Sequence, residues 1–302
     1  MFDPKGEQGG HVLQGEGDRR AQGVIAPSVM DEDHLALAAA CAPDVGLCTI
    51  VGIEGSFSRR LGAQLAILPD GEVVGDLADT CLERQLVTDL RDIEEPAVVR
   101  YGAGSPKIDF RLPCGGGLDI LLDPAPDRAA CRHVLERLDE REPASLALPG
   151  NARMAERAFI PSLRLRVFGE GAEPRALGEL AEASGVMAEL IGVDALSLGR
   201  GSGLPAADAW TAVLLLFHDH EWEMALLEEA LASPAFYIGA QGGKNAREGR
   251  EELLRERGHA PDAIGRIRSP VGALPACRTA RALALSALTE IVGDYERLRP
   301  GA

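Results

Sequence analysis

The chain has 302 residues, a length that indicates two domains and leaves room for a substantial core. It carries 47 acidic against 31 basic residues, a formal charge of −16. Such an acidic surface repels phosphate backbones and excludes nucleic-acid binding as a general role. No apolar run approaches the roughly 20 residues of a membrane helix, and no signal segment is visible. We therefore expect a cytoplasmic protein that has no membrane segment and whose six cysteines are reduced.

Residues 1–28 predict a disordered tail, because glycines and mixed charges occur there without apolar periodicity. Residues 29–150 mix strands and helices without strict alternation, which indicates an α+β domain. One of its helices begins with Thr80-Cys81-Leu82-Glu83, the pattern of a capping box. The other elements expected here are helices at 31–42 and 127–142 and strands at 47–51, 64–68, 72–74, 97–99, 108–112 and 118–122.

Residues 151–162 predict a linker, and residues 163–302 follow a different pattern in which short apolar strands alternate with helices. This alternation is typical of a parallel sheet covered on both faces. The strands are expected at 164–168, before 193, at 212–217 and at 235–238, and the helices at 174–184, 222–231, 246–257 and 279–297. The predicted fold class is α/β: an N-terminal α+β domain followed by a Rossmann-like doubly wound parallel-sheet domain.

A glycine turn at the end of the first strand of the second domain offers one candidate site. Gly169 and Gly171 let backbone amides and a helix N-terminus face a phosphate, as in dinucleotide-binding proteins. The third glycine of that pattern is absent, and Glu170 and Glu173 place negative charge beside the turn. The turn is therefore either a cofactor site or a tight turn without a ligand. The first reading makes the protein an NAD(P)-dependent oxidoreductase, our alternative hypothesis.

Two further segments follow strands of the same expected sheet. Gly239 leads into a glycine-rich loop with Lys244 and Arg247 behind it, which is either a second phosphate site or a solvated basic face. His218 and His220 are separated by one residue, so on an extended segment they point in opposite directions. We therefore favour an ordinary polar loop over a metal site at these histidines.

Cys114-Gly115-Gly116-Gly117 is the motif we favour most. Three consecutive glycines expose unhindered N–H donors, which in the right conformation form an anion-binding nest. A thiol at the edge of such a nest has its thiolate stabilised, as a sulfur-exchanging or metal-ligating group requires. The other interpretation is a flexible hairpin turn with an incidental cysteine. Cys81 has two similar readings, a nucleophilic thiol at a helix N-terminus or a small buried residue.

Several pieces of the chain, taken in order, resemble the XdhC/CoxI family, accessory proteins of xanthine dehydrogenase and related molybdenum hydroxylases. The pieces are GSFSRRLGA at 55–63, CLE at 81–83, LPCG at 112–115, HD at 218–219, SPAFYIGA at 233–240 and RSPVG at 268–272. The resemblance implies a chaperone without an enzymatic activity of its own. Such a protein binds molybdenum cofactor as cargo, supports its sulfuration by a cysteine desulfurase, and delivers it to the apo-hydroxylase.

The resemblance also implies roles for individual residues. Cys81 and Cys114 match the two motif cysteines of the family, and Arg59 and Gly62 lie in its arginine–glycine loop. Cys114 is the residue expected to hold the metal. The family commonly carries two glycines before the first cysteine, whereas Asp79 and Thr80 stand here. The sequence leaves open whether a homodimer forms.

Overall fold

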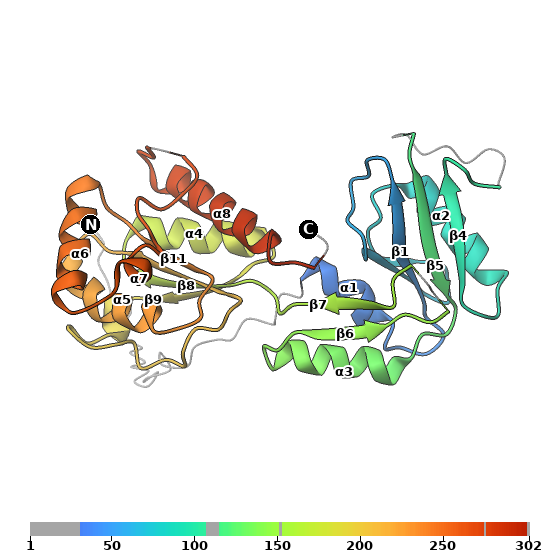
Figure 1. Cartoon of the computed structure of the whole chain (residues 1–302), viewed down its shortest axis with the longest axis horizontal. Helices are drawn as coiled ribbons and strands as arrows, with labels where there is room; N and C mark the ends of the chain where they lie inside the picture. The colour runs from blue at the N-terminus through green and yellow to red at the C-terminus, as the bar shows by residue number, and fades with distance from the viewer. Residues whose placement is uncertain (1–30, 107–114, 151–152, 275, 301–302) are drawn as a thin grey trace, which may run out of the picture.

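The computed structural model describes residues 31–106, 115–150, 153–274 and 276–300. Two sheets lie side by side along the molecule (Figure 1). The first is fully antiparallel, with strand order β3-β2-β1-β5-β4. Its strands are β1 (Gly46–Glu54), β2 (Gln64–Ile67), β3 (Val73–Gly75), β4 (Ala97–Gly102) and β5 (Gly117–Asp123). The expected hairpin at 64–74 is present as β2 and β3, and the expected strand at 118–122 as β5.

Both faces of the antiparallel sheet are buried, because side chains on alternate positions pack against different helices. Cys48 and Ile50 of β1 pack toward α2 (Thr80–Arg91), while Leu47 and Val51 pack toward α1 (Glu32–Ala39) and α3 (Arg128–Asp139). These two helices and a two-stranded ribbon of β6 (Ala144–Ala147) and β7 (Glu156–Phe159) form the second layer.

The start of α2 differs from the expected capping box. The N-cap is Asp79, whose Oδ1 accepts hydrogen bonds from the N–H groups of Cys81 and Leu82 at 2.9 and 3.0 Å. Glu83 Oε1 instead accepts the N–H of Leu77 at 2.9 Å. Thr80 is thus the first helical residue, because the carboxylate before it satisfies the two open amides.

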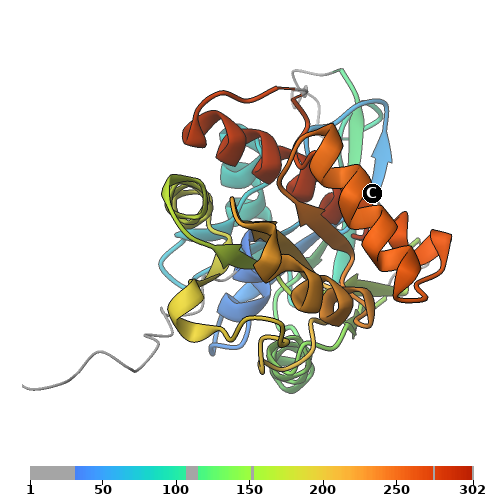
Figure 2. The same cartoon turned by 90° about the vertical axis from the view of Figure 1, so that its left-hand side faces the viewer.

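The second sheet is fully parallel, with strand order β12-β11-β10-β8-β9. Numbered along the chain this is the 2-1-3-4-5 order of doubly wound folds, with its switch point between β8 and β10. Helices α4 and α8 cover one face and α5 and α6 the other (Figure 2). The elements are β8 (Arg164–Gly169), α4 (Ala172–Ala183), β9 (Met187–Ile191), η1 (Val193–Ala195), β10 (Thr211–Leu216), η2 (His220–Trp222), α5 (Glu223–Leu231), β11 (Tyr237–Ala240), α6 (Lys244–Glu256), α7 (Pro261–Ile264), β12 (Ile267–Arg268) and α8 (Ala280–Glu296).

The predicted fold class is confirmed, with an antiparallel-sheet domain followed by a parallel-sheet domain. Strand β7 lies inside the range 151–162 that the sequence assigned to a linker. Within it, Arg157 and Phe159 are buried. No helix in the described ranges is long and apolar enough to cross a membrane.

Candidate functional site

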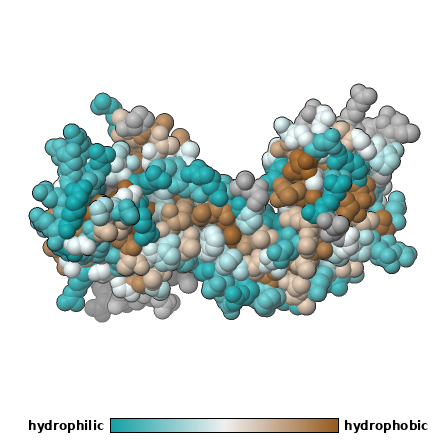
Figure 3. Space-filling view, viewed as in Figure 1, coloured by the Kyte–Doolittle hydropathy of each residue, from teal (hydrophilic) through white to brown (hydrophobic). Residues whose placement is uncertain are grey.

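A cleft of about 1190 Å³ lies between the two domains. It slightly exceeds the roughly 300–1,000 Å³ of typical small-molecule sites. The first domain contributes the start of α1, the β1–β2 loop and the end of β3, and the second contributes the end of α4 and one face of α8. The space-filling view shows the hollow between the two lobes (Figure 3).

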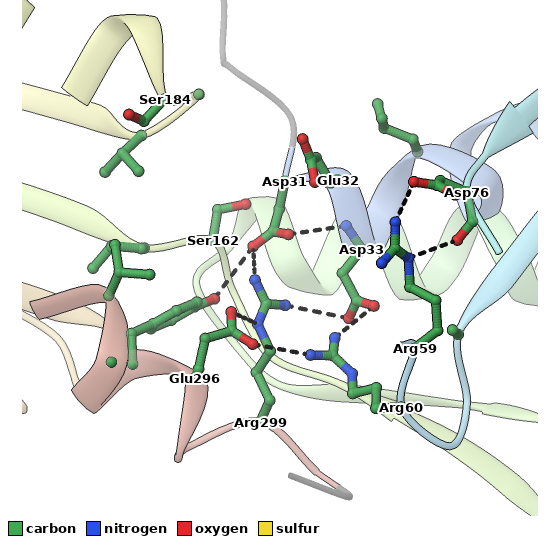
Figure 4. Close-up of a pocket in the computed structure, with 18 of the residues that line it drawn as sticks. Asp31, Glu32, Asp33, Arg59, Arg60, Asp76, Ser162, Ser184, Glu296 and Arg299 are labelled. Carbon is green, nitrogen blue, oxygen red and sulfur yellow. Dashed lines mark hydrogen bonds and ion pairs between the residues drawn. The ribbon is translucent and has the colours of Figure 1, made fainter. Parts of the chain in front are cut away.

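A cluster of ion pairs centred on Asp33 forms the floor of the cleft (Figure 4). Three guanidinium groups surround its carboxylate: those of Arg60 and Arg157 at 2.6 Å and that of Arg299 at 3.3 Å. Arg299 also contacts Asp31 at 2.6 Å. Burial alone raises the pKa of Asp33, but the three arginines outweigh it and lower that pKa below its usual range. Asp33 is therefore held as a carboxylate.

The same cluster joins the two domains. Arg60, in the β1–β2 loop, contacts Glu296 of α8 at 3.3 Å, and Arg299 reaches α1 from beyond the end of α8. A separate pair, Arg141 with Asp208 at 2.8 Å, links the domains elsewhere. Because these groups come from distant parts of the chain, their contacts fix the width of the cleft.

Arg59 and Gly62, predicted from the arginine–glycine loop, have different surroundings. Arg59 lines the cleft, remains about one-third exposed and forms an ion pair with Asp76. Gly62 is buried with φ +85°, and a Cβ there would lie 2.7 Å from Arg157 Cδ. Its carbonyl accepts the Nε–H of Arg157 at 2.7 Å. Arg59 is thus available to a ligand, whereas Gly62 makes room for a buried arginine.

Cys81 and the glycine turn lie at the end of the antiparallel sheet that borders the cleft. The last residues of β3 and the first residues of α2 and β5 lie here. Gly117, at the start of β5, pairs with Glu54 at the end of β1 and with Gly102 at the end of β4. Cys81 is exposed, and a Cβ at Gly115 (φ +70°) would meet nothing within 4 Å. Neither residue is among those lining the cleft. Cys114 lies outside the described residues, as do Ile108, Phe110 and Leu112 of the expected ribbon.

The other two glycines of the motif are packed. Gly116 is buried and accepts the N–H of Ala103 at 2.8 Å. A Cβ at Gly117 would lie 2.2 Å from Nη2 of Arg100, whose Nη1 donates to Asp119 at 3.1 Å. Among the three glycines of the motif, Gly115 is therefore the one with open space around it.

Burial distinguishes two of the other described cysteines, Cys48 and Cys131, from Cys81. Burial raises the pKa of Cys131 to about 12 and also raises that of Cys48. A buried thiol with a raised pKa is a poor nucleophile and metal ligand. Cys41 is partly exposed, although desolvation raises its pKa as well, and Cys277 is also partly exposed. Among the described cysteines, Cys81 is the exposed one.

Gly169 and Gly171 lie far from this end of the molecule. The cleft borders the amino edge of the parallel sheet, since Leu163 precedes β8 and Val186 precedes β9. The glycine turn lies at the carboxyl edge, one strand length or about 20 Å away at ~3.3 Å per residue. A Cβ at Gly169 would lie 2.3 Å from the carbonyl oxygen of Leu216. The structure thus separates these glycines from Arg59 and Cys81.

The remaining predicted residues of the parallel sheet also lie at its carboxyl edge. Gly239 is buried within β11, where a Cβ would lie 2.7 Å from the Tyr237 ring. His218 contacts Glu173 at 3.5 Å, and His220 contacts the buried Glu223 at 3.0 Å. No group of three metal-ligating side chains occurs among the residues that the structure describes.

Comparison with known proteins identifies the family. The model of the XdhC and CoxI family matches residues 40–102, and that of the XdhC Rossmann domain matches residues 165–291. The molybdenum cofactor insertion chaperone PaoD of Escherichia coli (strain K12) is 34% identical over 268 residues, 81% of this chain and 81% of that protein. The chain belongs to the XdhC/CoxI family.

A solved structure supports the same fold for this family member. A Bacillus halodurans protein described as a xanthine dehydrogenase superposes with a TM-score of 0.70 at 20% identity. The match covers 90% of this chain and 98% of that one. At this identity the likeness shows the fold alone.

Sequence reasoning missed most of the charged floor of the cleft in this XdhC/CoxI protein. Arg60 was visible beside Arg59 in the GSFSRRLGA segment but was not singled out. The other members gave no local signal, because each is an ordinary charged residue that has a partner far along the chain. They are Asp31, Asp33, Arg157, Glu296 and Arg299.

Proposed function

We propose that this chain is a molybdenum cofactor insertion chaperone for a xanthine dehydrogenase-type molybdenum hydroxylase. The 34% identity to PaoD over 81% of both chains supports this role. In this proposal the cofactor is cargo: the chain binds it, shields it from water and passes it on, without an enzymatic reaction of its own. The hydroxylase is a partner, as is a cysteine desulfurase that supplies the terminal sulfur.

The observation that carries the proposal is the large interdomain cleft with Arg59 on its wall. Molybdenum cofactor carries a phosphate and a metal held by two sulfurs. An arginine binds phosphate through parallel N–H donors, and soft thiolates suit the metal. Arg59 and the exposed Cys81 provide such groups near the cleft, and the sequence pattern adds Cys114, which precedes Gly115 in the chain.

Asp76 has a specific part in this proposal. It pairs with Arg59 while its Oδ1 also accepts the N–H of Ala78, and these contacts lower its pKa. The Arg59–Asp76 pair is partly exposed, so it contributes little to stability and is readily exchanged. A phosphate entering the cleft can therefore take the place of the carboxylate without unfolding the loop.

The test is the pterin content of protein purified from a host that makes molybdenum cofactor, measured as fluorescence after oxidative release. We expect Arg59→Gln and Cys114→Ala to lose most of the pterin, and Cys81→Ala to lose less. The matched controls are Arg257→Gln, which removes an exposed ion pair with Glu228 on the far side of the second domain, and Cys277→Ala. Parent protein without pterin contradicts the proposed function. Equal pterin in Arg59→Gln, Cys114→Ala and parent contradicts the assigned residues.

A further inference from the structure

One face of α8 forms an apolar wall of the cleft. Leu285, Leu288, Val292 and Gly293 recur at helical spacing, and all four line the cleft. Leu285 is 56% exposed, among the most exposed of the large apolar side chains in the described residues. An exposed leucine within a concave surface indicates a binding site more strongly than one on a convex face.

The end of α4 extends this wall. Leu180 and Val186 are half-buried and also line the cleft, next to the face of α8. The space-filling view shows apolar side chains facing the hollow from the side of the second domain (Figure 3). We call the surface formed by Leu180, Val186, Leu285, Leu288 and Val292 the aliphatic wall.

The opposite side of the cleft is polar, and the cleft as a whole is nearly neutral in charge. The complete lining carries five acidic and four basic side chains, and Arg157 lies directly beneath. The chain as a whole carries −16. An anion therefore meets much less repulsion here than over the rest of the surface. In the close-up, Arg59 and Asp76 lie on the side away from Ser184, with the Asp33 cluster between them (Figure 4).

Two buried polar atoms of the cleft residues lack a hydrogen-bond partner within the described part of the chain. They are Oε1 of Gln64, an acceptor, and Nε of Arg60, a donor. Gln64 is 7% exposed, and its amide nitrogen donates to Thr49 at 3.0 Å. A buried polar atom without a partner is costly unless a ligand or water meets it. Both atoms thus indicate a ligand that has hydrogen-bonding edges as well as an apolar face.

We propose that the aliphatic wall holds the flat heterocyclic ring of the cargo, with its anionic end toward Arg59. This inference rests on the proposed function and adds the orientation of the bound molecule. A pterin ring fits the three observations together: its faces are apolar, its edge carries amide and amine groups, and its substituent ends in a phosphate. Packing on Leu285 and Val292 removes apolar surface of both partners from water.

The test uses two kinds of variant: one adds a bulky ring beside the aliphatic wall, and the other adds a charge to it. Both are made at open positions of α8, so that the fold is kept. Gly293 lies within α8, and a Cβ there meets nothing within 4 Å, so Gly293→Phe places a ring in the cleft. The matched control is Gly249→Phe, since Gly249 lies within α6 and is equally open. A second pair is Leu285→Glu against Leu253→Glu on α6, two leucines that are 56% and 49% exposed.

We expect Gly293→Phe and Leu285→Glu to lower bound pterin at least tenfold, while Gly249→Phe and Leu253→Glu retain it. Circular dichroism confirms that all four variants are folded. If the parent carries no pterin, the proposed function itself fails. If the parent and both cleft variants carry equal pterin, only the ring placement fails. If the cleft variants keep pterin but no longer activate the hydroxylase, the aliphatic wall is a protein-docking surface, and the inference is overturned.

Discussion

Glycine turns occur at both sheets of this protein, but they serve different purposes. At the carboxyl edge of the parallel sheet, Gly169 has no room for a side chain because the Leu216 carbonyl lies against it, and His218 contacts Glu173 at the start of α4. At the cleft end of the antiparallel sheet, the space around Gly115 is open and Cys81 is exposed. The glycine at the carboxyl edge of the parallel sheet allows close packing of the backbone. The open glycine at the cleft end of the antiparallel sheet leaves space for a ligand.

The predicted glycines of the parallel sheet and the predicted residues near the cleft do not belong to one site. A dinucleotide site at the carboxyl edge and a cargo site at the cleft would be two separate sites on opposite ends of the second domain. The amino edge of the parallel sheet faces the cleft, although ligands of doubly wound folds usually bind at the carboxyl edge. The second domain of this protein therefore contributes to the cleft with the ends of α4 and α8, not with its glycine turn.

The largest expected effect is on the free energy of unfolding, when the buried arginine at the cleft or the one at the carboxyl edge of the parallel sheet is replaced. Arg157→Met leaves Asp33 short of one partner, and Arg250→Met does the same to Glu223, which Arg250 contacts at 2.8 Å. Arg250→Met should lower the free energy of unfolding by about 3–5 kcal/mol, because the buried Glu223 loses its arginine counter-ion. Arg157→Met should lower it by less, because Arg60 and Arg299 still pair with Asp33. Urea titration measures this loss. Pterin content then shows which of the two regions holds the cargo. Among the folded variants, we expect Arg157→Met to carry less pterin and Arg250→Met to carry as much as the parent. An equal reduction in Arg250→Met would place the carboxyl edge in the cargo site.

An intermediate effect compares two glycines. Gly169→Ala should cost about 2–3 kcal/mol, since φ is +148° and the new methyl group would lie 2.3 Å from a backbone oxygen. Gly115→Ala should cost only about 1 kcal/mol, the strain of a left-handed residue in open space. Thermal unfolding gives both values. Similar losses in the two variants would show that the turn at Gly115 is as tightly packed as the one at Gly169.

The smallest effect is a pH dependence at the cleft end. Burial lowers the pKa of His34, whose Nε2 lies 3.0 Å from the Ile160 carbonyl. The unfolded chain therefore takes up a proton at a higher pH than the folded chain. Stability should fall on the order of 1 kcal/mol between pH 7 and pH 5 through this group. His34→Gln should remove that slope in urea titrations, and His218→Gln, which alters an exposed histidine at the other end, should leave it in place.

A second acid-sensitive group lies beside His34 and acts at lower pH. The pKa of Asp33 is lowered in the folded protein, so its stabilising effect is complete above about pH 4, the unfolded value, and is lost as the pH falls further. The two groups can be distinguished because their contributions disappear in different pH ranges. An Asp33→Asn variant should reduce the slope of the stability curve below pH 4, and Asp76 and Asp208, whose pKa values are also lowered, should keep part of that slope.

Much of the fold could be predicted because it depends on local periodicity. Leu118, Ile120 and Leu122 alternate as a strand does, and they are buried on one face of β5. The apolar run from 212 to 217 likewise predicts β10. The N-cap of α2 is Asp79, one residue before the predicted Thr80. Both are good N-cap residues, and only the backbone conformation decides between them.

The floor of the cleft could not be predicted in this way. Strand β7 carries a buried arginine, and a charged residue in a short segment indicates a surface loop rather than a core strand. The partners of its members are far apart in the chain: Arg157 and Asp33 by 124 positions, Arg299 and Asp31 by 268. Such pairs produce no periodic signal. The sequence likewise shows which residues are glycines but not which of them have space around them.

The Arg299–Asp31 contact has a mechanical consequence. The two domains are joined by the covalent connection between β7 and β8, by this ion pair, and by the Arg60–Glu296 and Arg141–Asp208 pairs. Moving the domains apart requires the contacts of Arg60 and Arg299 to break. Admission and release of a bound molecule are thus coupled to the loss of these ion pairs.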